Sequence, residues 1–287
     1  MEPKFATATL SSLNSTSTGQ EAMDRTGSDF EHPVQPQSAR LVDLRLRELA
    51  YKYEIPEETV ELLRPLSNFE IVLLCDDSGS MKTPVDGTGK TRWDELRSVV
   101  KIVLEIGCIF DSNGLDLFFL NRESFRNIRD LGQVDQAFIA PPAGYTPLVP
   151  VLRKILQLPV TRPNDSKKLL IFIATDGEPT DERGKPNVDE LQHVMNDERY
   201  SDTTHVMFLV CTDDAASVNY LRQWDQTMKN VDVTDDFRTE RELIRRKNGA
   251  NHPFSLSDYI AKALVGAVNR QIDVLDDLPQ ANNGDGQ

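Results

Sequence analysis

The sequence has 287 residues, of which 39% are hydrophobic and 27% are charged, and this balance is ordinary for a globular protein with a substantial core. A chain of this length can hold one large domain with extensions. The formal net charge of −14 disfavours nucleic-acid binding, which requires a basic face, so we expect no nucleic-acid partner. The acidity suits cations and basic partners, or serves solubility alone.

Other residue patterns exclude further protein classes. The cysteines Cys75, Cys108 and Cys211 are scattered in apolar runs, which indicates small buried residues and neither a disulfide framework nor a zinc site. The N-terminus lacks the apolar core of a signal peptide, and no window approaches the roughly 18 apolar residues of a membrane span. We therefore expect an intracellular, cytoplasmic protein without membrane insertion. The sequence carries no signal for a particular oligomeric state.

The N-terminal part of the chain divides into two segments. Residues 1–38 are rich in Ser, Thr, Gln and Gly and are expected to be disordered. Residues 39–67 are expected to form a helical extension, whose first helix (39–53) has apolar residues at helical spacing, namely Val42, Leu46, Leu49 and Tyr53. A second helix is expected to begin at Pro56 and end at Pro65. The extension is interpreted as a docking arm for another subunit or, preferably, as a packing element against the main domain.

From residue 68 the pattern becomes an alternation of strands and helices. Two continuous apolar runs, 69–75 and 167–175, are expected to be strands buried on both faces. Further strands are expected at 115–120, 204–212 and 230–235, with an antiparallel edge strand at 124–128. Helices are expected at 92–110, 147–158, 188–197, 215–228 and 255–269.

This alternation predicts an α/β domain over residues 68–270, built on a doubly wound, mostly parallel Rossmann-like sheet. Residues 271–287 are expected to form a flexible acidic tail. The last helix is expected to bury one face, formed by Leu256, Ile260, Ala263, Leu264 and Ala267.

Polar side chains follow the apolar strands at their carboxyl ends, where parallel sheets bind ligands. Asp76, Ser78 and Ser80 follow the first such strand, Asp176 follows the second, and Thr146 lies in a third loop just before a helix. Carboxylate and hydroxyl oxygens are the ligands that hard divalent cations prefer. With three neutral hydroxyl ligands, a cation held here would keep uncompensated positive charge and would favour a carboxylate from outside.

These residues carry a resemblance to a known family. The motifs D-x-S-x-S at Asp76, G-x-T-P-L at Thr146 and T-D-G-E at Asp176 resemble, in order and position, those of a von Willebrand factor type A (VWA) domain with an intact metal-ion-dependent adhesion site. The resemblance covers about residues 68–270. It implies a Rossmann-like fold and a metal site formed by Asp76, Ser78, Ser80, Thr146 and Asp176 that binds Mg²⁺, Mn²⁺ or Ca²⁺. It also implies protein recognition through an acidic residue of the partner. Asp77 departs from the pattern and is expected either to point away from the ion or to weaken carboxylate binding.

The leading hypothesis is a metal-dependent protein interaction module in an intracellular complex, and not an enzyme. One alternative is a metal-independent scaffold that binds through the helical extension or through the basic cluster 237–247, with the metal site bracing loops or vestigial. A magnesium-dependent phosphohydrolase is less favoured, because no nucleophile, base or positive clamp is evident. The segment Gly89-Lys90-Thr91 resembles the end of a phosphate-binding loop, but Pro84 stands where that motif needs glycine.

Overall fold

The computed structural model describes residues 37–159 and 167–269. The expected disorder of residues 1–36 and the expected flexible tail at 271–287 lie outside the described residues. No helix in the described ranges is both long enough and apolar enough to cross a lipid bilayer.

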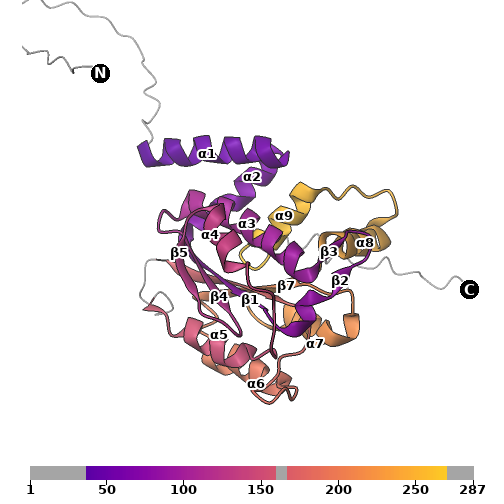
Figure 1. Ribbon diagram of the computed structural model, residues 1–287. Helices are drawn as coiled ribbons and strands as arrows, with labels where there is room; N and C mark the ends of the chain where they lie inside the picture. Colours follow the sequence, from indigo (N-terminus) through magenta and orange to yellow (C-terminus); the bar gives the residue numbers. More distant parts are fainter. Residues whose placement is uncertain (1–36, 160–166, 270–287) are drawn as a thin grey trace, which may run out of the picture. The chain divides into compact units, whose positions relative to one another are not determined.

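Six strands of the described chain form one sheet in the order β5-β4-β1-β6-β7-β8 (Figure 1). Neighbouring strands run parallel except β5, which pairs antiparallel with β4 at one edge. The chain winds outward from β1 in one direction and then from β6 in the other, so the sheet is a doubly wound, Rossmann-like one. The strands are β1 (Phe69–Cys75), β4 (Leu115–Phe119), β5 (Phe125–Ile128), β6 (Lys168–Thr175), β7 (Thr204–Val210) and β8 (Val231–Thr234).

Helices cover both faces of the sheet (Figure 1). One face carries α3 (Arg92–Phe110), α4 (Leu131–Ala137) and α9 (Leu256–Val265), and the other carries α5 (Leu148–Leu156), α6 (Val188–His193) and α7 (Ala215–Thr227). Because successive strand residues point to opposite faces, β1 supplies Leu73 to the first core and Leu74 to the second. Both faces of β1 are therefore buried away from water, which explains its continuous apolar run.

The N-terminal extension packs against the domain. It consists of α1 (Gln37–Tyr53) and α2 (Glu57–Leu63), which contact α3 and α9 respectively. Leu46 and Leu63 are buried, and Lys52 forms an ion pair of 2.5 Å with Glu105 of α3. The packing interpretation of this segment is thus the correct one for its inner face, whereas Leu41, Leu44 and Tyr51 of α1 are exposed.

Several local predictions differ from the structure. Pro56 precedes α2, and Pro65 lies inside a short 3₁₀ turn (Arg64–Asn68) that continues the helix. The expected helix 188–197 is α6 followed by a π-helical turn, Val194–Glu198. Leu256 is 47% exposed, because it is the first residue of α9, whereas the other predicted core residues of that helix are buried.

Further elements accompany the predicted ones in the described ranges. Neither α4 nor the hairpin formed by β2 (Pro84–Val85) and β3 (Lys90–Thr91) was predicted from the sequence. The basic cluster forms α8 (Phe237–Asn248), which lies next to this hairpin in Figure 1.

The edge strand β5 is short and irregular. Its pairing with β4 shifts register between Leu115 and Leu117, and Asn127 has a φ of 53°. The backbone N–H of Asn127 donates to the Asp116 carboxylate at 3.0 Å, and Arg126 pairs with the same carboxylate at 3.1 Å.

Candidate functional site

The predicted site residues lie where β1 and β6 end, at the centre of the sheet. The two strands are neighbours, and the backbone N–H of Asp76 extends their pairing by donating to the Ala174 carbonyl at 2.9 Å. Asp76, Ser78 and Asp176 are buried, whereas Ser80 is exposed. This is the position where the winding direction of the sheet reverses, which is the usual ligand site of such sheets.

Hydrogen bonds join four of the five predicted residues. The hydroxyls of Ser78 and Ser80 are 2.9 Å apart, and Ser80 Oγ donates to Asp176 Oδ1 at 2.8 Å. Asp76 accepts from the backbone N–H of Ser78 at 2.8 Å and from the Thr175 hydroxyl at 2.8 Å. We refer to Asp76, Ser78, Ser80 and Asp176 as the oxygen cluster.

The fifth predicted residue, Thr146, lies in a loop that is fastened to both strand ends. Gly79 N–H donates to the Gly144 carbonyl at 3.0 Å, which ties this loop to the one after β1. The backbone N–H of Thr146 donates to the Thr180 hydroxyl at 3.0 Å, which ties it to the segment after β6. Thr146 is thus held beside the oxygen cluster through its backbone.

Gly144 is required in this loop. Its φ of 106° is disfavoured for other residues, and a Cβ there would lie 2.6 Å from Asn121 Oδ1. Asn121 itself donates through Nδ2 to the Tyr145 carbonyl at 2.8 Å. Glycine therefore allows the close approach of this loop to the end of β4.

Asp77 points away from the oxygen cluster and forms a buried ion pair. One of its carboxylate oxygens accepts from Arg122 Nε at 2.6 Å, and the other accepts from the backbone N–H of Asn121 at 2.8 Å. Arg122 also donates to the carbonyls of Ala140 and Pro141. The first of the two alternatives for Asp77 is therefore the one observed. Its charge is neutralised, and the pair holds the loop that carries Thr146.

A second arginine contacts the oxygen cluster directly. Arg92, the first residue of α3, donates through Nη1 to Asp176 Oδ2 at 2.9 Å and through Nη2 to the Thr212 hydroxyl at 2.7 Å. Its side chain is 15% exposed. Neither Arg92 nor Arg122 was predicted from the sequence, because their partners are 84 and 45 residues away. For Arg92, the sequence offered one signal, which is a cation at the first position of a predicted helix, where the helix dipole disfavours it.

The electrostatics of the cluster favour a nearby cation. Burial, followed by repulsion from Asp176, raises the pKa of Asp76 to about 6, although the hydrogen bonds from Ser78 and Thr175 oppose this shift. A raised carboxyl pKa means that the ionised form is costly here, and a cation would reduce that cost.

The donor set fits a hard divalent cation and no softer metal. The cluster offers only carboxylate and hydroxyl oxygens, which suit Mg²⁺, Mn²⁺ or Ca²⁺. Within the described ranges, no group of three or more His, Cys, Asp or Glu side chains could hold a metal ion. A cation at this site would therefore depend on the serine and threonine hydroxyls. Arg92 is the one departure from a simple ligand set, since it occupies Asp176 Oδ2.

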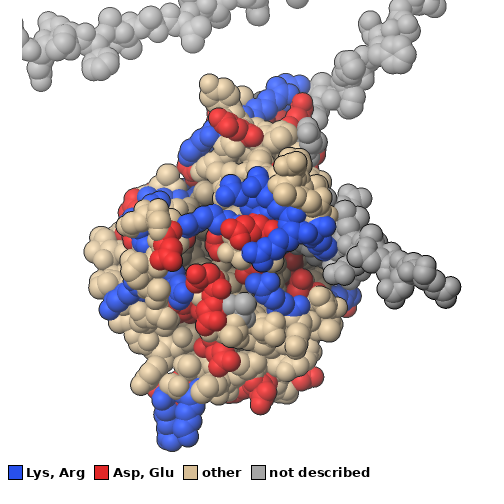
Figure 2. Space-filling model, turned by 90° about the vertical axis from the view of Figure 1, so that its right-hand side faces the viewer, with Lys and Arg blue, Asp and Glu red and all other residues tan. Residues whose placement is uncertain are grey.

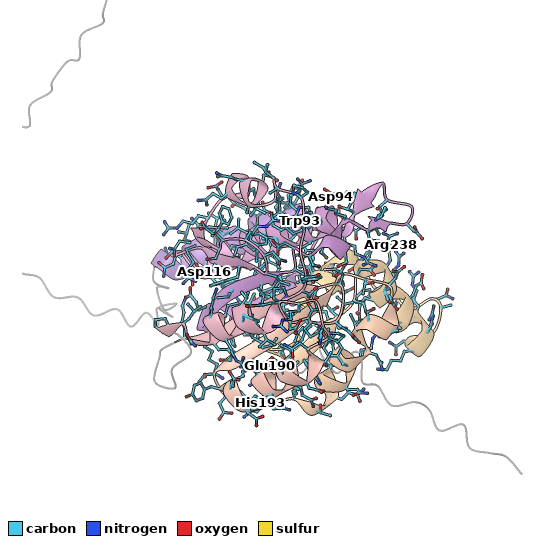
Figure 3. All side chains as sticks on the ribbon, turned by 60° about the horizontal axis from the view of Figure 1, so that its bottom comes forward. Trp93, Asp94, Asp116, Glu190, His193 and Arg238 are labelled. Atoms are coloured by element: carbon cyan, nitrogen blue, oxygen red, sulfur yellow. The ribbon has the colours of Figure 1, made fainter. Side chains whose placement is uncertain are left out.

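A groove of mixed polarity lies beside the loop of Thr146, and its polar lining consists of Lys82, Thr91, Asp94, Arg97 and Asp135. Its lining includes Trp93 and Phe138, whose rings are 4.2 Å apart, together with Ile139, Pro141 and Pro142. In Figure 3, Trp93 and Asp94 lie at one side of the domain with Arg238 nearby, whereas Glu190 and His193 of α6 lie at the opposite side. Ile139 and Tyr145, in or next to this loop, are 78% and 57% exposed.

The sequence was compared with known proteins. No protein-family model matches it, and no curated protein matches it.

Proposed function

We propose that the oxygen cluster and Thr146 hold a divalent cation, Mg²⁺ or else Mn²⁺ or Ca²⁺, and that this cation binds an acidic residue of a protein partner. This is the activity that the resemblance to VWA domains implies. The observation that carries the proposal is the chain of hydrogen bonds from Ser78 through Ser80 to Asp176. These bonds join side-chain oxygens from two separate loops, and Ser80 is exposed to solvent, which supports a cation site at this point.

The residues of the site would have different roles in holding the cation. Ser78, Ser80 and Thr146 would contribute neutral oxygens, while Asp76 and Asp176 would contribute negative charge directly or through water. A cation with mostly neutral ligands would supply a positive centre for a carboxylate. The Asp77–Arg122 pair would keep the third loop in place without adding charge to the site.

The surroundings of the site support a protein partner over a small free anion. Two exposed large side chains near the cluster, Ile139 and Tyr145, would give a partner apolar contact area. Such area is what distinguishes protein recognition from the capture of a single charged group.

The test begins with the cation alone. Isothermal titration with MgCl₂ and MnCl₂ compares the full chain with Ser78→Ala, Asp176→Ala and, as a matched control, Ser98→Ala on the exposed side of α3. The first two variants should lose at least about tenfold in affinity, which corresponds to about 1.4 kcal/mol. Ser98→Ala should bind as the unaltered chain does, and circular dichroism should show that all variants are folded.

The second stage captures partners from lysate in Mg²⁺ and in EDTA and identifies them by mass spectrometry. Partners that the proposal requires are retained by Ser98→Ala and lost both in EDTA and with Ser78→Ala. If the unaltered chain binds no divalent cation at millimolar concentration, or if its partners withstand EDTA, the proposal is wrong.

A specific observation favours a second candidate, the metal-independent scaffold. Leu41, Leu44 and Tyr51 lie on the outer side of α1, with 49%, 55% and 90% of their surfaces exposed. Replacing these three residues by Ser should abolish partner binding if the scaffold hypothesis is right and leave it unchanged if the metal site is responsible. Deleting the extension is a poorer test, because Leu46 and Leu63 belong to the core.

The basic cluster of α8 offers weaker support for a scaffold. Arg238 pairs with Glu95 at 3.5 Å and donates to the Asp86 carbonyl, and Arg246 pairs with Glu242 at 3.2 Å. Figure 2, which faces this side of the molecule, shows basic and acidic side chains interspersed. These contacts are those of an ordinary charged helical face.

A further inference from the structure

Arg92 occupies a position that local structure does not favour. It is the first residue of α3, a helix of 19 residues whose N-terminus is closed by a capping box between Thr91 and Asp94. The positive end of a helix dipole disfavours a cation in the first turn by roughly 0.3–1 kcal/mol. The guanidinium is nevertheless held in a defined place, with one nitrogen on Asp176 and the other on Thr212.

The same contact determines the charge of the proposed metal site. In their carboxylate forms, which bind a cation, Asp76 and Asp176 contribute two negative charges, and the guanidinium of Arg92 contributes one positive charge next to Asp176. Asp77 does not alter this balance, because Arg122 neutralises it. Asp213 lies 3.6 Å from Arg92, but its side chain is 84% exposed, so water screens its charge. The three groups therefore carry one net negative charge without a cation and one net positive charge with a divalent cation.

We propose that Arg92 is a built-in competitor of the divalent cation for Asp176, and that it keeps the cation-loaded site positively charged. The inference rests on the proposed function and deepens it. A cation that must share Asp176 with a guanidinium binds weakly by itself. It binds more tightly when an anionic group arrives, because that group offsets the remaining positive charge. Cation and partner carboxylate thus strengthen each other's binding, as linkage requires.

The experiment measures Mg²⁺ binding by isothermal titration for the unaltered chain, Arg92→Gln, Arg92→Lys and a control, Arg97→Gln. Arg97 is on the same helix and pairs with Asp94 at 3.5 Å. Arg92→Gln removes the charge and should bind Mg²⁺ about tenfold more tightly, because the Coulomb repulsion between the guanidinium and the cation is lost. Arg92→Lys keeps the charge and should remain within about twofold of the unaltered chain, as Arg97→Gln should.

A second titration adds acetate as the anionic probe, with sodium chloride adjusted to constant ionic strength. Acetate should increase Mg²⁺ affinity in the unaltered chain and in Arg92→Lys, and should have little effect in Arg92→Gln. Thermal unfolding in EDTA verifies that each variant is folded.

The outcomes separate this inference from the proposed function. If Arg92→Gln and Arg92→Lys both weaken Mg²⁺ binding, Arg92 only orients Asp176, and the inference is overturned while the metal site stands. It is also overturned if acetate acts equally on all variants. If Arg92→Gln alone binds Mg²⁺ measurably, Arg92 does compete with the cation, but the proposed function fails because the unaltered chain does not bind it. If no variant binds a divalent cation, the proposed function itself fails.

Discussion

Gly266, at the end of α9, provides a test of the packing between this helix and the sheet. Its φ of −53° and ψ of −52° are helical, so helix propensity alone predicts that Gly266→Ala stabilises the protein by about 1 kcal/mol. The structure predicts the opposite sign. A Cβ at this position would lie 1.6 Å from Asp232 Oδ2 and 2.9 Å from Met207 Cε.

The expected magnitude follows from what must move. Asp232 and Met207 are 1% and 0% exposed, so neither side chain can turn into solvent. Overpacking of a core costs about 1–3 kcal/mol, and moving the buried Asp232 carboxylate away from the Val233 N–H that donates to it costs about 1–3 kcal/mol more. After the gain in helix propensity is subtracted, we expect a net destabilisation of about 3 kcal/mol.

The assay is urea unfolding followed by circular dichroism, with Gly132→Ala in α4 as the matched control. Gly132 is exposed, and a Cβ there would meet nothing closer than Asp130 Oδ1 at 3.1 Å. This control should change the free energy of unfolding by less than about 1 kcal/mol. If Gly266→Ala is as stable as the unaltered chain, Gly266 does not pack as closely against Asp232 of β8 as inferred.

Three further predictions concern buried charged groups. Lys262→Met should destabilise the protein by about 3–5 kcal/mol, because it leaves the buried Glu240 carboxylate without the ammonium group 2.5 Å away. A double-mutant cycle with Glu240→Gln, measured by urea unfolding, would contradict this if it gave no coupling energy. Burial lowers the pKa of His205 from 6.5 to about 4, so its neutral form contributes stability that is complete above pH 6.5 and is lost as the pH falls towards 4. Unfolding free energies of the unaltered chain and of His205→Leu should diverge over that window, and parallel curves would show that the histidine is not responsible. Arg122→Met should cost about 3–5 kcal/mol, because the Asp77 carboxylate is fully buried, and Asp77→Asn should recover part of the loss. If the melting temperature of Arg122→Met is within about two degrees of that of the unaltered chain, the pair does not stabilise the fold as expected.

The strands could be predicted from the sequence because strands buried on both faces are continuous runs of apolar residues. The run 69–75 is apolar throughout, since β1 is covered on both faces, and the predicted range coincides with the strand. The short helix α4 was missed because its seven residues include only Leu131, Val134 and Ala137 as apolar positions. A hairpin of two-residue strands such as β2–β3 leaves no detectable periodicity.

One part of the candidate site could likewise be predicted from the sequence, and another part could not. The proximity of Asp76 and Asp176 could be predicted because both directly follow strands, and the ends of neighbouring parallel strands meet. Arg92 and Arg122 could not be found, because nothing local indicates which carboxylate a distant arginine will reach. Pairing across 84 residues depends on where α3 begins relative to β6, and this is a property of the tertiary packing.

The irregular edge strand has a consequence for how the protein behaves in a crowded solution. A straight, exposed edge invites another chain to add a strand, and this is a common route to aggregation. Here β5 has four residues, a register shift against β4 and a left-handed backbone at Asn127, and Arg126 is charged. At the opposite edge, all four residues of β8 are buried. A sheet with such edges resists growth by strand addition.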